Sequence, residues 1–442
     1  MARAPQTDSH AGKPRGQAGG AGETAGLRAR CAKFIGNLGP GLISGASDDD
    51  PSGISTYSMA GASFGYGMLW TALFSFPLIA AMQLMSARLG TVKGKGLGAL
   101  VRECYPGWVL WGTCILLVIA SLTNASADLA GMAEATQLAT GTRATIWTVI
   151  YTAVITTLMF GASYRRISNI FRWLTLVLFA YVITAFLGGF DWKAAVHATL
   201  LPHLEWSKDS LAMFVGIMGT TISPFLFFWQ ATQEVEEKNA ARTGFSRRAG
   251  SISANLRQAR LDVGVGMFIS NAIMYFIILT AAATLHAHGK THIQTAREAA
   301  EALRPLAGSG AYWIFNLGLI GTGMLAIPAL IGSSAYAVSE AAQWPGSLEK
   351  PPWRAWHFYG FIAASMAVAL ALDFTGISAV RMLFWAAILN GVLSPPVILL
   401  VVLLSSNPRV MGKRTNPAAL RWLGWTTFAV MSAASIGLFF TL

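Results

Sequence analysis

The chain has 442 residues, of which 54% are hydrophobic and only 12% are charged, and its net charge is +12. About a quarter of the residues in an ordinary soluble domain are charged, so this composition excludes a large soluble domain. The cysteines number only three and indicate neither a disulfide framework nor a zinc site. Apolar runs of about 18 residues or more recur along the chain, which predicts an all-α polytopic membrane protein.

The first residues have the composition of a tail. Residues 1–33 are rich in Gly, Ala, Arg and polar residues, show no periodicity, and lack the apolar core and cleavage site of a signal peptide. We expect a disordered basic tail in the cytoplasm, followed by a membrane domain over residues 34–442.

Eleven membrane spans are predicted, two of them with a break. Most of the 32 Lys and Arg residues fall in the segments that these spans place on the same side as the N-terminus. Basic residues are retained in the cytoplasm, so the N-terminus is predicted to lie there and the C-terminus outside. The positive charge therefore follows membrane topology, and we expect no nucleic-acid binding. The predicted spans are residues 35–61 (broken at Asp50), 66–87, 107–139, 144–162, 170–189, 210–236 (broken at Pro224), 261–285, 309–340, 354–373, 379–404 and 419–441.

Three carboxylates and a proline interrupt the first span. Asp48, Asp49 and Asp50 are followed directly by Pro51. A charge near the bilayer centre costs roughly 2.5 kcal/mol or more, and a proline removes a helical hydrogen bond, so a plain anchor would carry neither. The pattern predicts a broken helix whose carbonyl groups and carboxylates face a cation. A loop between two short helices is the alternative.

A second break is predicted in the sixth span. Thr220, Thr221 and Ser223 lie there between Gly219 and Pro224. Two Gly/Pro-interrupted spans that are five apart indicate an inverted-repeat transporter with its site near the bilayer midplane. We expect repeats over residues 34–190 and 209–405, with an additional helix over residues 418–442.

At these breaks the sequence resembles the Nramp family of divalent-metal transporters, which have the LeuT-type fold. The family signatures Asp-Pro-Gly-Asn and Met-Pro-His correspond to Asp50-Pro51-Ser52-Gly53 and Ser223-Pro224-Phe225. The likeness extends to Gly39-Pro40-Gly41, to Asp128-Leu129-Ala130 and to the stretch from Asn407 to Gly412. The resemblance implies a 5+5 inverted repeat with discontinuous helices one and six and an eleventh span. It also implies a divalent cation as cargo, with no cofactor and no enzymatic activity.

The departures from the family pattern fall on the metal ligands. The family holds its metal with the Asp and Asn of the first motif, the sixth-helix Met and a backbone carbonyl, whereas Gly53 and Ser223 replace the Asn and the Met here. The remaining candidate ligands are Asp50, Asp49, Thr220, Thr221, Ser223 and backbone carbonyls. Such an all-oxygen site suits Mg²⁺ and looks like the Nramp-related magnesium transporters. The alternative is a proton-coupled Mn²⁺/Fe²⁺ symporter of the Nramp type, because Mn²⁺ also accepts oxygen ligands.

Proton coupling depends on the third span. Proton-coupled members carry Asp-Leu-Ala-Glu there, and in this chain Gly131 replaces the second acid after Asp128. Glu134 lies about one helical turn further and could substitute, or could be a structural partner of a polar neighbour. We therefore expect gradient-driven transport without protons. Further pathway candidates are Gln230, Glu234 and Asn390. The alternatives are packing inside the bundle for Gln230, a solvated helix end for Glu234 and satisfaction of kinked backbone for Asn390.

The sequence as a whole predicts import of a divalent cation, Mg²⁺ ahead of Mn²⁺, by alternating access in the plasma (inner) membrane. The expected partners are the metal ion and the lipid bilayer. One rival is an amino-acid carrier of the same fold, but three acids beside the first break oppose binding of a carboxylate. The other rival is an intramembrane aspartyl hydrolase that uses Asp50 and Asp128.

Overall fold

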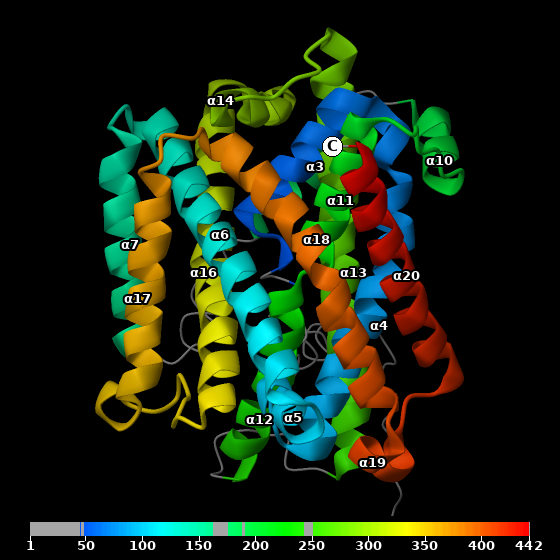
Figure 1. The fold of residues 1–442 in the computed structure, drawn as a ribbon. Coiled ribbons are helices and arrows are strands. Elements are labelled where there is room, and N and C mark those ends of the chain that lie inside the picture. The colour runs from blue at the N-terminus through cyan, green and yellow to red at the C-terminus, as the bar shows by residue number, and fades with distance from the viewer. Residues whose placement is uncertain (1–44, 46–47, 162–175, 188–190, 243–250, 442) are drawn as a thin grey trace, which may run out of the picture. The chain divides into compact units, whose positions relative to one another are not determined.

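The structure, a computed structural model, describes residues 45, 48–161, 176–187, 191–242 and 251–441. These belong to one compact unit, and the predicted tail over residues 1–33 lies outside the described residues. Every regular element in these ranges is a helix (Figure 1). The α-helices are α3 (Pro51–Phe64), α4 (Trp70–Lys93), α5 (Leu97–Cys104), α6 (Gly107–Thr140), α7 (Ala144–Gly161), α9 (Phe179–Leu187), α10 (Trp192–Leu200), α11 (Lys208–Thr221), α12 (Pro224–Arg242), α13 (Ile252–Thr284), α14 (Ala296–Ala300), α15 (Arg304–Ala307), α16 (Ala311–Ala342), α17 (Trp356–Asp373), α18 (Ala379–Ser406), α19 (Pro408–Met411) and α20 (Ala418–Thr441).

The described residues contain 9 helical stretches that are long and apolar enough to cross a membrane, with α11 and α12 together forming one of them. All of these stretches coincide with predicted spans, so the all-α membrane architecture is confirmed. The other two predicted spans are represented by α3 and α9, and parts of both lie outside the described residues. The total of eleven spans therefore stays a prediction.

Helix ends differ from the predicted span ends where the chain leaves its apolar stretch. α13 begins at Ile252 instead of near residue 261, because the Ser251 side chain accepts a hydrogen bond from Ala254 N and caps the helix. α4 continues to Lys93 instead of ending near residue 87, and Gly94, at φ +65°, terminates it. Apolar length therefore predicts the membrane-crossing part of a helix, whereas capping residues decide where the helix stops.

The broken span α11–α12 lies in the middle of the helix bundle. Of its most apolar stretch, 94% is buried inside the protein, compared with 28% for α7 and for α20. α11 packs on α18, α12 packs on α4 and α16, and α3 packs on α13. Figure 1 shows α7 beside α17 at one edge of the bundle and α20 at the opposite edge. The second break is thus surrounded by protein.

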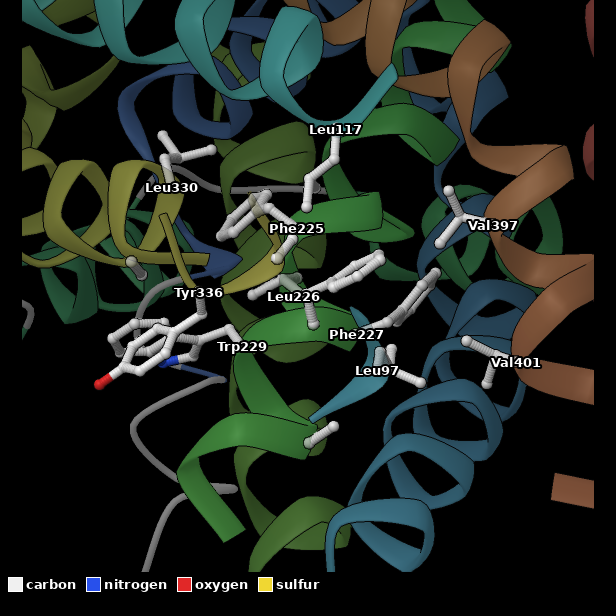
Figure 2. Close-up of a cluster of buried hydrophobic side chains, with 14 of the residues drawn as sticks. Leu97, Leu117, Phe225, Leu226, Phe227, Trp229, Leu330, Tyr336, Val397 and Val401 are labelled. Carbon is white, nitrogen blue, oxygen red and sulfur yellow. The ribbon is translucent and has the colours of Figure 1, made fainter. Parts of the chain in front are cut away.

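A buried apolar cluster holds the segment that follows the second break (Figure 2). Phe225, Leu226, Phe227 and Trp229 of α12 are each at most 2% exposed. They share this cluster with side chains of four other helices, namely Leu97 of α5, Leu117 of α6, Leu330 and Tyr336 of α16, and Val397 and Val401 of α18. Between membrane helices the gain over lipid contact comes from close van der Waals packing. The cluster therefore fixes the position of the first turns of α12.

Glycine lets two helices touch just before the second break. A methyl group at Gly219 would lie 2.1 Å from Ala387 O and 2.5 Å from Gly391 N, both in α18. Gly45, ahead of the first break, packs in the same way, since its methyl group would lie 2.5 Å from Gly266 O in α13. Small residues at such contacts let membrane helices approach backbone to backbone. Each break is thereby held against a neighbouring continuous helix.

Candidate metal site

The first break ends at Asp50, which caps the N-terminus of α3. Asp50 has extended backbone (φ −74°, ψ 170°), and Pro51 occupies the first helical position. Asp50 Oδ1 accepts hydrogen bonds from Gly53 N (2.7 Å) and from Ser52 Oγ (2.7 Å). A carboxylate is a preferred N-cap and the first helical position tolerates proline, so the local sequence favours a helix start here. The side chain of Asp50 is buried, at 2% exposure.

A second carboxylate reaches the same helix end from α6. Asp128 Oδ1 accepts a hydrogen bond from Ser52 N (3.2 Å), and Asp128 is fully buried. Within the described ranges, Asp128 Oδ2 has no hydrogen-bond partner, and neither Asp50 nor Asp128 forms an ion pair. Two buried carboxylates therefore meet at one helix N-terminus, whose dipole favours negative charge but supplies only about half an elementary charge.

The other two acids of the first break turn toward α13. Ser270 Oγ lies 2.8 Å from Asp48 Oδ2 and 3.0 Å from Asp49 Oδ1. The candidate ligand Asp49 is thus placed beside Asp48 and Ser270, whereas Asp50 lies on the α3 terminus. Asp48 Oδ1 is buried and has no hydrogen-bond partner among the described residues.

The second break leaves Ile222 and Ser223 between α11 and α12. Ser223 Oγ is within hydrogen-bond distance of two carbonyl oxygens that the helix end frees, those of Gly219 (2.7 Å) and Thr220 (2.8 Å). Ser394 Oγ of α18 donates to Ile222 O at 2.8 Å. Hydroxyl groups therefore satisfy part of the backbone that the break leaves open.

The candidate residue Asn390 lies beside Ser223. Its Nδ2 donates to Ser223 Oγ at 3.5 Å, while its Oδ1 is buried and has no hydrogen-bond partner within the described part of the chain. The structure thus brings two sequence-predicted residues together at the second break, and one amide oxygen there is left to accept a hydrogen bond.

The two threonines of α11 point at a residue that the sequence analysis missed. Thr220 Oγ1 donates to the hydroxyl of Tyr57 at 3.0 Å, and Thr221 Oγ1 lies 3.2 Å from the same hydroxyl. Tyr57 belongs to α3, so these contacts connect the helix after the first break with the helix before the second. Tyr57 is the one tyrosine in α3 and lies one turn after Gly53, a position that could have marked it as a neighbour of the site.

The pathway candidates Gln230 and Glu234 lie one turn apart on α12. Gln230 Nε2 donates to Glu234 Oε1 (3.1 Å), and Thr91 of α4 donates to Glu234 Oε2 (3.2 Å). Glu134 lies elsewhere, because its Oε1 accepts a hydrogen bond from Ala296 N (3.0 Å) at the start of α14. The observed partner of Glu134 is therefore a helix terminus, and no hydrogen bond of the described residues joins it to either break.

The candidate ligands at the two breaks are all oxygen atoms. No group of three or more His, Cys, Asp or Glu side chains in the described ranges is arranged to hold a metal. A cation here would depend on Asp50, Asp128, backbone carbonyls, amide or hydroxyl oxygens and retained water. Oxygen donors of this kind suit the harder divalent ions, Mg²⁺ and Mn²⁺ among them.

Comparison with known sequences points to one family. Residues 41–441 match the family described as Nramp, natural resistance-associated macrophage protein-like. The divalent metal cation transporter MntH of Klebsiella pneumoniae is 24% identical over 399 residues, which are 89% of this chain and 91% of that protein. MntH of Yersinia enterocolitica is 28% identical over 292 residues, which are 65% of this chain and 68% of that protein.

Solved structures show the same fold. The manganese transporter of Eremococcus coleocola, in complex with an aromatic bis-isothiourea substituted compound, matches with a TM-score of 0.73 and 17% identity over 95% of this chain and 87% of that one. Mhp1, a nucleobase-cation-symport-1 family transporter in a closed conformation, matches with a TM-score of 0.55 and 15% identity over 91% of this chain and 90% of that one. The LeuT-type fold that the resemblance to the Nramp family implies is thereby confirmed.

Proposed function

The chain belongs to the Nramp family, and from that premise we propose that it moves a divalent metal cation across a membrane by alternating access at its two helix breaks. The cation would bind between the N-terminus of α3 and the break after Thr221. Broken helices suit this task because their freed carbonyl groups supply ligands and their ends can shift without unfolding a continuous span.

The observation that supports this proposal best is the pair of buried carboxylates, Asp50 and Asp128. Both contact the first turn of α3, and neither has a counter-ion among the described residues. A buried charge without a partner is costly, and a bound cation offsets that cost. Family membership favours cation transport over the aspartyl hydrolase that the same pair could support.

We propose Mn²⁺ as the cargo, in place of the Mg²⁺ that the ligand positions predict. A relative of the same fold is a manganese transporter, and the relatives with higher identity are divalent metal cation transporters. Mn²⁺ accepts carboxylate, carbonyl and water ligands, all of which this site can offer. Mg²⁺ is the second candidate, and the observation in its favour is the absence of an amide and a thioether at Gly53 and Ser223.

Uptake by proteoliposomes that contain the purified full chain tests this proposal. Asp50→Asn removes the charge and retains an N-cap residue, since Asn caps helices about as well as Asp. Asp191→Asn is a matched control because Asp191 caps α10 through bonds from Lys193 N and Ala194 N and is exposed. We expect Asp50→Asn to lose divalent-ion uptake by at least about tenfold, because hydrogen bonds and contacts to charged groups are worth about 1.5–3 kcal/mol.

The control variant should transport at the wild-type rate. Retained uptake in a folded Asp50→Asn protein would refute the role of this carboxylate. Competition of Mg²⁺ against Mn²⁺ in the same vesicles decides between the two cargoes, since an excess of the preferred ion suppresses uptake of the other.

We further propose that the protein lies in the plasma (inner) membrane with its N-terminus in the cytoplasm and its C-terminus outside. The 9 apolar stretches of the described residues and the excess of basic residues in the segments predicted to lie on the side of the N-terminus support this arrangement. Fusions of a reporter that is active on only one side of the membrane, placed at each terminus, test it. The same reporter should be active at one end only.

A further inference from the structure

Tyr57 bounds the space beside Asp50. It is 1% exposed, and its ring lies over Gly53, one turn earlier in α3. A methyl group at Gly53 would lie 3.2 Å from Tyr57 Cε2, 3.5 Å from Tyr57 Cζ and 3.4 Å from Asp50 Oδ1. Any larger side chain at position 53 would therefore compete with the tyrosine ring for the volume next to the Asp50 carboxylate.

The hydroxyl of Tyr57 holds that ring in place. The Thr220 hydroxyl donates to it at 3.0 Å. The Thr221 hydroxyl donates to Ile217 O at 2.8 Å, which leaves Thr221 Oγ1 to accept from the phenol at 3.2 Å. These bonds run from α3 to α11, and they engage two hydroxyl groups that the sequence offered as cation ligands. The phenol is thus fixed by partners on both sides, and the ring cannot rotate away without breaking them.

We propose that Tyr57 is a specificity-determining residue that keeps position 53 free of a side-chain ligand. This inference rests on the proposed function. At this point of the site the cation then meets water in place of a protein oxygen. Mg²⁺ gives up its bound water molecules reluctantly. A site that leaves one of these water molecules in place therefore lowers the affinity for Mg²⁺ less than a site that replaces it with a protein ligand. Tyr57 and Gly53 together therefore reduce the preference of the site for Mn²⁺ over Mg²⁺.

A double-mutant cycle tests this pairing on the full chain in detergent, with Mn²⁺ and Mg²⁺ dissociation constants measured by titration calorimetry. Gly53→Asn alone should leave the Mg²⁺/Mn²⁺ Kd ratio within about twofold of wild type, because the ring denies the new side chain its place. Gly53→Asn with Tyr57→Ala should raise that ratio about tenfold beyond the product of the two single changes, which corresponds to a coupling free energy of about 1.4 kcal/mol. Tyr57→Ala alone should change it by less than about threefold.

Two further variants separate the ring from its hydroxyl and from general packing. Tyr57→Phe retains the ring but removes the bonds that fix it, so Gly53→Asn in this background should raise the ratio by less than it does with Tyr57→Ala. Tyr151→Ala removes another buried tyrosine with a threonine partner, Thr136 at 2.7 Å, outside the site. Combined with Gly53→Asn it should give additive effects. If Tyr57→Ala does not fold, Tyr57→Val also removes the ring and leaves a smaller cavity.

A tenfold rise in the ratio for Gly53→Asn alone would overturn the proposal, and so would a fully additive cycle with Tyr57. Wild-type protein that binds neither cation would instead refute the proposed function. The two failures are therefore distinguishable, because the cycle with Tyr57 is interpreted only if the wild-type protein binds a cation.

Discussion

Gly219→Ala should destabilise the protein strongly, although alanine is the better helix former. The added methyl carbon would lie 2.1 Å from Ala387 O and 2.5 Å from Gly391 N. Carbon and oxygen atoms normally stay more than about 3 Å apart, so α11 and α18 would have to separate by about 1 Å. Overpacking costs about 1–3 kcal/mol where flexible side chains can adjust. Both neighbours here are helix backbone, so we expect a loss at or above the upper end of that range.

Gly112→Ala is the matched control for this change. Gly112 lies in α6, and a methyl group there would meet no atom within 4 Å. Replacing an unconstrained helical glycine by alanine stabilises a helix by about 0.5–1 kcal/mol. The two variants should therefore shift the apparent melting temperature, followed by tryptophan fluorescence in detergent, in opposite directions. A Gly219→Ala protein that melts at or above the wild-type temperature would refute the close helix contact, and with it the account of how the second break is held.

Three further predictions concern the cation. Asp128→Asn should weaken metal binding by about 10- to 100-fold in calorimetry, because it removes a buried charge and retains the side-chain size; wild-type affinity would exclude Asp128 from the site. Ser223→Met should shift uptake toward Mn²⁺ or Cd²⁺ relative to Mg²⁺, since a thioether is a softer ligand than a hydroxyl, and an unchanged preference would mean that this position does not select the ion. A pH-sensitive dye inside the vesicles should stay silent during uptake, because Gly131 replaces the second acid of the third span and Glu134 caps α14. Acidification that follows metal entry would establish proton symport instead.

The two helix breaks could be predicted from the sequence, because the residues that disfavour a continuous helix lie at the breaks themselves. Three carboxylates before Pro51, and Pro224 within an apolar run, are unfavourable in a continuous membrane helix whatever surrounds them. The structure begins α3 at Pro51 and α12 at Pro224, as these residues require. The hydrogen bond between Asn390 and Ser223 could not be predicted in this way, since it depends on how α18 packs beside the second break.

The directions of the side chains could not be predicted from spacing. Thr220 and Thr221 carry hydroxyl groups that can bind a cation. In the structure both hydroxyl groups are hydrogen-bonded to Tyr57, which is more than 160 residues away in the chain. Asp49 is a second example, because its carboxylate accepts a hydrogen bond from Ser270 of α13. A contact between distant segments leaves no periodic signal, so the sequence supplies the list of candidates and the packing selects among them.

The apolar cluster around the start of α12 limits how this protein can change shape. If water entered beside Phe225, Leu226, Phe227 and Trp229, each side chain would lose roughly 1.5–3 kcal/mol, and the total would rival the entire free energy of binding an ion at micromolar affinity, about 8 kcal/mol. One cargo ion cannot supply that work. α12 must therefore move together with its neighbours or stay still, and in the proposed transport cycle the gate on its side of the site is formed by other parts of the chain.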